Sequence, residues 1–291
     1  MTDGRAPEPV PPELCIDLHL HSTASDGSRP PEEVVATALV AGLHTMALTD
    51  HDTVAGIAAA REAALGTSLN VVAGVELSAY QGDDETHLLG LHLEDIAGMD
   101  SGLHLFREAR YARGEGMVAR LNAIGVKISF ADVLEQSRGG AIGRPHVAKA
   151  LVENGWARDL RDAFDRYLGL GRPAFLEKRR LSIRDAIGMV HECGGLAFLA
   201  HPGAHTNKAR LAALQVQGLD GAEVLHPSHS AEDRRRLLEG VESLGMLPSG
   251  GSDSHGASEG PRVIGSMHVP LAWLARHHER LDARRKSATV V

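Results

Sequence analysis

Two histidines, two residues apart, carry the first chemical signal in this chain. In the segment CIDLHL at 15–20, strand-like alternation puts apolar side chains on one face and Asp17, His19 and the following His21 on the other. Two imidazoles side by side have the spacing needed to grip one metal ion. An isolated H-x-H is more often a pair of surface histidines, so the interpretation depends on what other segments supply.

The ends of further strand-like segments carry the same kinds of side chain. The segments LTDHD, GVELS, LAHPG and GSDSH, together with the start of HLLGLHL, bring in Asp50, His51, Asp52, Glu76, His87, His201, Asp253 and His255. Barrel enzymes place their active sites at the rim where strands end. The sequence therefore predicts a site rich in histidine and carboxylate at one rim of a sheet.

Seven short apolar segments are expected to form the strands that position these residues. They lie at 15–20, 45–49, 70–76, 87–93, 195–200, 221–225 and 246–250. Helical patterns follow most of them, at 31–42, 54–65, 183–194 and 231–245. Alternating strands and helices imply a parallel sheet, and seven such strands favour an α/β barrel over an open sheet.

One stretch interrupts this alternation. Residues 97–180 contain no good strand but several helical patterns, at 103–125, 144–154 and 157–169, which predicts a helical insertion that caps the site. The predicted organisation is a flexible tail at 1–13, a discontinuous barrel at 14–96 and 181–271, the insertion at 97–180, and a polar tail at 272–291 that is either a frayed helix or disordered.

Composition excludes several classes of protein. The 291 residues include 30 Lys and Arg against 38 Asp and Glu, a net charge of −8, which argues against a surface that binds duplex DNA. No apolar run approaches the roughly 18 residues of a membrane span, and the first residues lack the apolar core of a signal peptide, so a cytoplasmic location is expected. Two Cys are too few for a disulfide framework. The unusual number is 17 His.

Taken together, the motifs resemble the PHP family, the polymerase and histidinol phosphatase superfamily of metal-dependent phosphoesterases. The motifs H-x-H-S-x-x-S-D-G, L-T-D-H-D, G-V-E-x-S, A-H-P-G and G-S-D-x-H occur in order over about residues 15–270. The resemblance implies a distorted (β/α)7, TIM-like barrel. The middle motifs G-R-P-H-V-A-x-x-L-V-x-x-G and Y-L-G-L-G-R-P-A-F resemble a subgroup of nucleotide phosphatases that act on 3',5'-bisphosphonucleotides and AMP-like substrates, with a relative that trims short RNA.

The resemblance also implies a set of nine metal ligands. The first ion would be held by His19, His21 and Asp253, the second by His87 and His201 with Glu76 bridging to the first, and the third by Asp26, His51 and His255. Asp50 and Asp52 would orient ligands or cap the following helix. Imidazoles mixed with carboxylates suit Mn, Fe or Zn better than Ca or Mg, so we expect two to three ions of those kinds.

The expected reaction is attack on phosphorus by a hydroxide that the metals generate from water. Asp26 and His51 are placed in the catalytic group as well as among the ligands. The leaving alkoxide needs a proton, for which His229 in EVLHPSHS is the first candidate and His226, otherwise a substrate contact, the second. The alternative for both is a polar loop.

The substrate's phosphates need cations beyond the metals. Arg144 at the start of a predicted helix combines a guanidinium with helix-terminal N–H groups, and His146 lies close by. Arg113 is the preferred member of Arg107, Arg110 and Arg113, which share one helix side. The remaining candidates are Arg172, where the subgroup commonly has Lys, and Lys178. Solvated helix faces are the alternative. Phe175 replaces the subgroup's Tyr.

These features predict a hydrolase of phosphoric monoesters that acts on a small nucleotide. The alternatives are a 5'-3' exonuclease on short RNA, a histidinol-phosphate phosphatase, and a non-catalytic PHP module with a regulatory role. The expected partners are a small phosphorylated substrate or short RNA, with neither duplex DNA nor a membrane.

Overall fold

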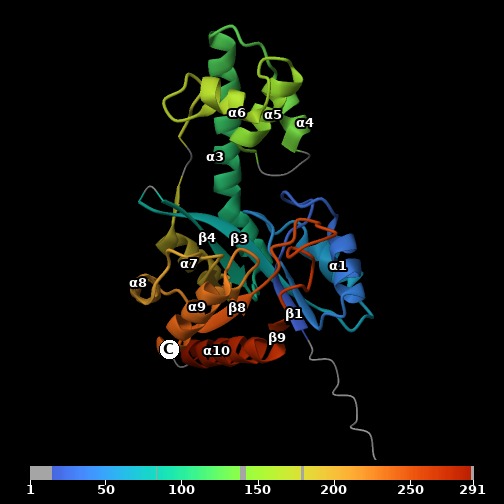
Figure 1. Ribbon diagram of the computed structural model, residues 1–291, viewed down its shortest axis with the longest axis vertical. Coiled ribbons are helices and arrows are strands. Elements are labelled where there is room, and N and C mark those ends of the chain that lie inside the picture. Colours follow the sequence, from blue (N-terminus) through green and yellow to red (C-terminus); the bar gives the residue numbers. More distant parts are fainter. Residues whose placement is uncertain (1–14, 83, 138–141, 178–179, 290–291) are drawn as a thin grey trace, which may run out of the picture.

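The computed structural model describes residues 15–82, 84–137, 142–177 and 180–289 (Figure 1). Its strands are β1 (Cys15–Leu20), β2 (Thr45–Leu48), β3 (Asn70–Gln81), β4 (Asp84–Leu91), β5 (Leu181–Ser182), β6 (Leu196–Leu199), β7 (Gly221–Leu225), β8 (Leu247–Gly250) and β9 (Val269–Pro270). They form one sheet in the order β8-β7-β6-β4-β3-β2-β1-β9, with β5 paired to β3. A parallel bridge from Leu20 to Ser254 links β1 to the segment after β8, so the sheet curves into a nearly closed barrel.

The predicted barrel is confirmed, but one strand runs against the expected direction. β4 pairs antiparallel with both β3 and β6, and β9 is antiparallel to β1, so the expectation of a wholly parallel sheet is wrong. The reason is local: a turn at Gly82, whose φ of +64° suits glycine, leads β3 directly back into β4 as a hairpin. Because β4 starts where β3 ends, His87 lies opposite Ser78 at the same rim as the other candidate ligands.

Helices cover the outside of the barrel. They are α1 (Pro31–Val40), α2 (Ile57–Ala63), α7 (Ile183–Glu192), α8 (Lys208–Val216), α9 (Ala231–Ser243) and α10 (Leu271–Thr289). In α7 the buried residues Ile183, Ala186, Ile187 and Val190 follow helical spacing and pack on the sheet. Ser182 caps this helix by accepting a hydrogen bond from the Asp185 N–H at 3.1 Å.

Five more helical segments lie between β4 and β5, where the insertion was predicted. They are α3 (Ile96–Ala123), α4 (Phe130–Ser137), α5 (Arg144–Glu153), α6 (Leu160–Ala163) and the π-helical turn η1 (Phe164–Leu168). The long helix α3 rises from the barrel, and α4 to α6 gather around its far half (Figure 1). They share an apolar cluster that includes Leu121, Val133, Val147, Leu151 and Leu168 and is separate from the barrel core. The domain boundaries themselves stay a prediction.

The C-terminal segment forms a helix, which was one of the two alternatives expected for it. Residues 271–289 are the helix α10, which packs across the barrel. Its Leu274, His277 and Leu281 are buried, and Arg284 pairs with buried Asp220 at 2.6 Å. The apolar positions were hidden among many charged residues, which is why the sequence pattern looked polar throughout.

The predicted tail at 1–13 lies outside the described residues. Within the described part of the chain, no helix combines the length and the apolar character needed to cross a membrane.

Candidate metal centre and phosphate cavity

The centre begins with the alternation of β1. Ile16, Leu18 and Leu20 point into the apolar core, while His19 and His21 are buried on the opposite side with their ring centres 5.1 Å apart. The backbone at Gly251 passes directly behind His19. A Cβ at position 251 would lie 2.5 Å from the Cβ of His19, so only glycine leaves room for the imidazole there.

Glu76 on β3 is the hub of the cluster. Its Oε2 lies 3.0 Å from His19 Nε2 and 3.1 Å from His21 Nε2. Its Oε1 lies 2.8 Å from His87 Nδ1 and 2.9 Å from His201 Nε2. His51 Nδ1 lies 3.4 Å from Oε2 as well. A buried carboxylate that contacts five imidazoles through both oxygens has the arrangement expected of a ligand shared between two ions.

Asp253 closes the cluster from the segment after β8. Its Oδ1 lies 3.3 Å from His21 Nε2 and 3.5 Å from both His19 Nε2 and His255 Nδ1. The backbone φ is +50° at Asp253 and +29° at His201, a region that non-glycine residues rarely adopt. Such strain persists where surrounding contacts hold it, and it is typical of functional sites.

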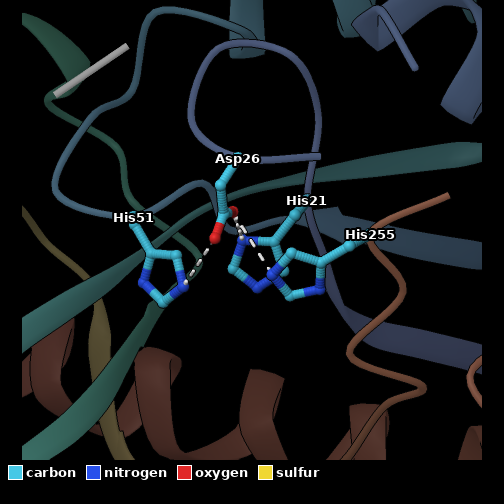
Figure 2. A group of neighbouring side chains, drawn as sticks. All are labelled: His21, Asp26, His51 and His255. Atoms are coloured by element: carbon cyan, nitrogen blue, oxygen red, sulfur yellow. Dashed lines mark ion pairs between the residues drawn. The ribbon is translucent and has the colours of Figure 1, made fainter. Parts of the chain in front are cut away.

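A second, more open group surrounds Asp26 (Figure 2). Its carboxylate lies 3.2 Å from His255 Nε2 and 3.8 Å from both His21 Nδ1 and His51 Nε2. The loop that carries Asp26 is fixed by Asp50, which accepts hydrogen bonds from the Ser22 N–H and the Ser25 hydroxyl, both at 2.7 Å. Asp50 therefore acts on the cluster through this loop.

All nine predicted ligands come together, and their chemistry fits divalent cations. His, Asp and Glu donors form overlapping sets whose atoms lie within 4.8 Å of one another. Both ring nitrogens of His21 are buried and lack a well-formed hydrogen bond in the described part of the chain. Buried polar atoms normally have partners, and a metal ion is a partner that imidazole nitrogens can accept. Their roles as ligands remain a proposal.

The charges in the cluster are set by burial and by mutual contacts. Burial alone would lower the pKa of His21, but the carboxylates of Asp253 and Glu76 raise it to about 9. Burial would likewise raise the pKa of Glu76, yet His19 and its neighbours hold it well below the usual value. The ionised carboxylates thus favour a proton on His21, and a divalent cation can replace that proton.

Sequence reasoning missed Glu223, which stands behind the cluster. This fully buried residue of β7 lies 3.1 Å from His19 Nδ1 and accepts a hydrogen bond from the His201 N–H at 2.7 Å. A carboxylate behind a metal-binding imidazole fixes the ring's tautomer and orientation. The available signal was a lone Glu inside the apolar strand GAEVL.

The two histidines predicted to move protons or touch substrate lie deeper than expected. His229 is 3% exposed, its Nδ1 lies 3.0 Å from the Val224 carbonyl, and its Nε2 accepts from the Gly203 N–H at 3.2 Å. With both nitrogens bonded to backbone, His229 is arranged for a structural role. His226 Nε2 lies 3.2 Å from Asp253, and its Nδ1 lies next to Ser228, so this ring contacts the metal cluster rather than a cavity.

Beside the cluster lies a cavity of about 580 Å³, which we call the arginine cavity. His51 and His87 border it on the side of the cluster, and its cationic lining is Arg110, Arg113, Arg144 and Arg180. The Arg144 guanidinium lies 5.6 Å from the Phe175 ring centre, and Arg113 donates to the Leu176 carbonyl at 2.7 Å.

Asp52 forms part of the same wall. It pairs with Arg110 and accepts from the Ser78 N–H at 2.9 Å. Asp52 therefore fixes Arg110 beside the cluster.

Other predicted substrate contacts lie elsewhere. His146 Nδ1 accepts from the Gly143 N–H at 3.1 Å and so caps α5, and it is not part of the described lining of the arginine cavity. Arg172 is exposed and also stands outside that lining. Lys178 lies outside the described residues. Arg180, which the sequence did not single out, lines the cavity instead.

Comparison with known proteins agrees with this geometry. The chain matches the PHP domain family over residues 17–180. It is 35% identical over 257 residues to the 3',5'-nucleoside bisphosphate phosphatase of Chromobacterium violaceum, covering 86% of this chain and 90% of that protein. It is 37% identical over 251 residues to the 5'-3' exoribonuclease Rnm of Salmonella typhimurium, covering 83% and 85%.

The similarity to known proteins extends to the fold of a solved structure. A protein from Bifidobacterium adolescentis described as a metal-dependent phosphoesterase is similar with a TM-score of 0.75 and 32% identity, covering 93% of this chain and 98% of that one. The family model, the relatives and the barrel agree with the resemblance seen in the motifs. The chain belongs to the PHP domain family.

Proposed function

We propose that this chain is a metal-dependent phosphatase that removes phosphate from a small nucleotide, with a 3',5'-bisphosphonucleotide as the leading substrate and AMP-like nucleotides next. The observation that carries the proposal is the arginine cavity opening onto His51 and His87 at the edge of the cluster. A nucleotide with two phosphates needs two anion sites. The cluster supplies one, and Arg113 and Arg144 supply the other.

The residues of the cluster would hold two to three divalent ions. When bound, such ions supply hydroxide from water near neutral pH and neutralise charge on the phosphate oxygens. Mn, Fe and Zn are the candidates because imidazole and carboxylate are mixed. His51 and Asp26 face the open side, since His51 lines the arginine cavity and the Asp26 side chain is 54% exposed.

The arginines would bind and orient the substrate. Guanidinium groups form paired hydrogen bonds to phosphate oxygens, and Arg113 is held in place by its bond to the Leu176 carbonyl. Burial, and then the repulsion from the nearby Arg144, lower the pKa of Arg113. An anionic ligand relieves this repulsion. His229 is not retained as the proton donor, because both its ring nitrogens are already bonded.

A 5'-3' exonuclease acting on short RNA is the second candidate, supported by the 37% identity to the Salmonella enzyme. Histidinol-phosphate hydrolysis and a non-catalytic regulatory role have less support. A cytoplasmic location stays a prediction.

A substrate panel tests the proposal. The full chain, purified with Mn²⁺ and assayed for bound metal, is given adenosine 3',5'-bisphosphate, AMP, histidinol phosphate and 5'-phosphorylated short RNAs. We expect the bisphosphate to have the highest kcat/KM. Cleavage of RNA without phosphate release from any monoester would favour the exonuclease, and bound metal without turnover of any ester would favour the regulatory module.

A further inference from the structure

A second cavity meets the cluster from the other side of His87. It measures about 560 Å³, and we call it the β4–α8 cavity; its lining includes Thr86, His87, Ala200, His201, Thr206 and Arg210. Glu85 and His87, near the start of β4, border both this cavity and the arginine cavity. The start of β4 therefore separates the two cavities, and His87, a candidate ligand of the cluster, lies between them.

Arg210 supplies the β4–α8 cavity with a positive charge and with N–H donors. This half-buried residue in the first turn of α8 donates from Nη2 to the Thr86 hydroxyl at 3.2 Å. Its Nε is buried and has no hydrogen-bond partner within the described residues. A guanidinium carries five N–H donors, so much of its capacity is unused by the described chain.

Hydrogen bonds from α9 hold the wall of the cavity that faces β4. Arg236 on α9 donates to the carbonyls of Thr206 and Gly203 and pairs with Asp233 at 2.6 Å. The Gly203 N–H bonds to His229, and the Thr206 hydroxyl donates to the Pro202 carbonyl at 2.8 Å. His229 therefore supports a preformed cavity wall, which explains its burial without a role in proton transfer.

The charges of this cavity select among anions. Arg210 is accompanied by the exposed carboxylates of Asp84 and Glu85. One guanidinium with two carboxylates is unfavourable for a dianionic monoester. This combination of charges suits a phosphodiester group, which carries a single negative charge. The hydroxyls of the attached ribose can donate hydrogen bonds to the two carboxylates.

We infer that the β4–α8 cavity is the subsite for the leaving nucleotide of a phosphodiester substrate, a dinucleotide or short oligonucleotide, with Arg210 as its recognition residue. The inference rests on the proposed phosphoesterase function and extends it from monoesters to diesters. In the hydrolysis, the oxygen of water bonds to phosphorus, the bond from phosphorus to the leaving ribose oxygen breaks, and that oxygen takes one of the two protons that the water brought.

The test compares two substrates in matched variants. The wild type, Arg210→Met, Thr86→Val and the control Lys208→Met are assayed with Mn²⁺ on the dinucleotide adenylyl-3',5'-adenosine, whose only phosphate is a diester, and on adenosine 3',5'-bisphosphate. Lys208 is exposed in the same first turn of α8 and does not line the cavity. We expect Arg210→Met to lower the ratio of dinucleotide to bisphosphate kcat/KM by about tenfold through the loss of charge-assisted hydrogen bonds. Thr86→Val should act in the same direction more weakly, and Lys208→Met should leave the ratio as it is.

A binding measurement separates recognition from turnover. The dissociation constant of a dinucleotide with a methylene group in place of the bridging oxygen should rise in Arg210→Met and not in Lys208→Met. An unchanged ratio and an unchanged dissociation constant in both cavity variants would overturn the inference. A wild type that hydrolyses the bisphosphate but neither cleaves nor binds the dinucleotides would overturn it while leaving the proposed function intact. Failure on both substrates would overturn the proposed function as well.

Discussion

The metal centre and the arginine cavity are built in different ways. Most residues of the centre come from strand ends and the turns that follow them, and their side chains are held by contacts among themselves, as with buried Glu76 and its five imidazoles. The arginine cavity draws Arg110 and Arg113 from α3 and Arg144 from α5, on helices with their own apolar cluster. On the proposed function, the barrel would carry the metal chemistry, and the inserted helices would carry the choice of substrate.

Substitution of Glu76 should have the largest effect on turnover. We expect Glu76→Gln to reduce turnover by about 1,000-fold, since a bound ion contributes several kcal/mol to charge stabilisation in the transition state. Metal content, measured by elemental analysis of the purified variant, should fall in parallel. A variant that kept both metal and activity would remove Glu76 from the centre.

Glu223→Gln should act on metal rather than on substrate. It keeps the size of the side chain but removes the charge that orients His19, so metal affinity should fall by about 10- to 100-fold. The measurement is a competition between the protein and a chelator of known affinity. Activity at saturating Mn²⁺ should recover in large part, and a defect that added metal did not relieve would contradict this role.

Arg144→Ala should affect the arginine cavity without affecting the metal centre. It leaves the centre intact, so metal content should match that of the wild type, while KM for the bisphosphate rises by about 10- to 100-fold through the loss of a charge-assisted contact worth about 1.5–3 kcal/mol. The exposed Arg172, outside the described lining, supplies the matched control in Arg172→Ala. Equal effects of the two substitutions would place the second phosphate elsewhere.

The smallest expected effect is on stability and follows from His21. Its pKa of about 9 in the folded protein is above the ordinary value of 6.5, so its pairing with Asp253 and Glu76 stabilises the metal-free protein fully below pH 6.5 and is lost as pH rises through 9. The Tm of chelator-treated protein should therefore fall between pH 6.5 and 9. The rise in Tm on adding Mn²⁺ should grow over the same range, because fewer protons compete. A metal-induced rise that shrank with pH would contradict the assignment.

The same contrast explains what the sequence could predict. The nine candidate ligands were accessible because period-two alternation and strand ends determine where side chains such as His19 and His21 project. Even the reversed β4 kept His87 at the right rim. Arg180, Arg210 and Glu223 were not found, because their proximity to the centre depends on how separate elements pack. His229 follows a predicted strand, which suggested a place at the rim of the site. Its hydrogen bonds to Val224 and Gly203 depend on the folded chain and could not be read from the sequence.

The central claim is that Glu76 and the eight candidate ligands around it form the metal centre of a phosphoesterase. Anomalous diffraction at the manganese absorption edge, from crystals of the full chain grown with Mn²⁺, tests it most directly. We expect anomalous density among His19, His21, Glu76 and Asp253, and further density among Asp26, His51 and His255. Density only at other sites, or none in this cluster at saturating Mn²⁺, would contradict it.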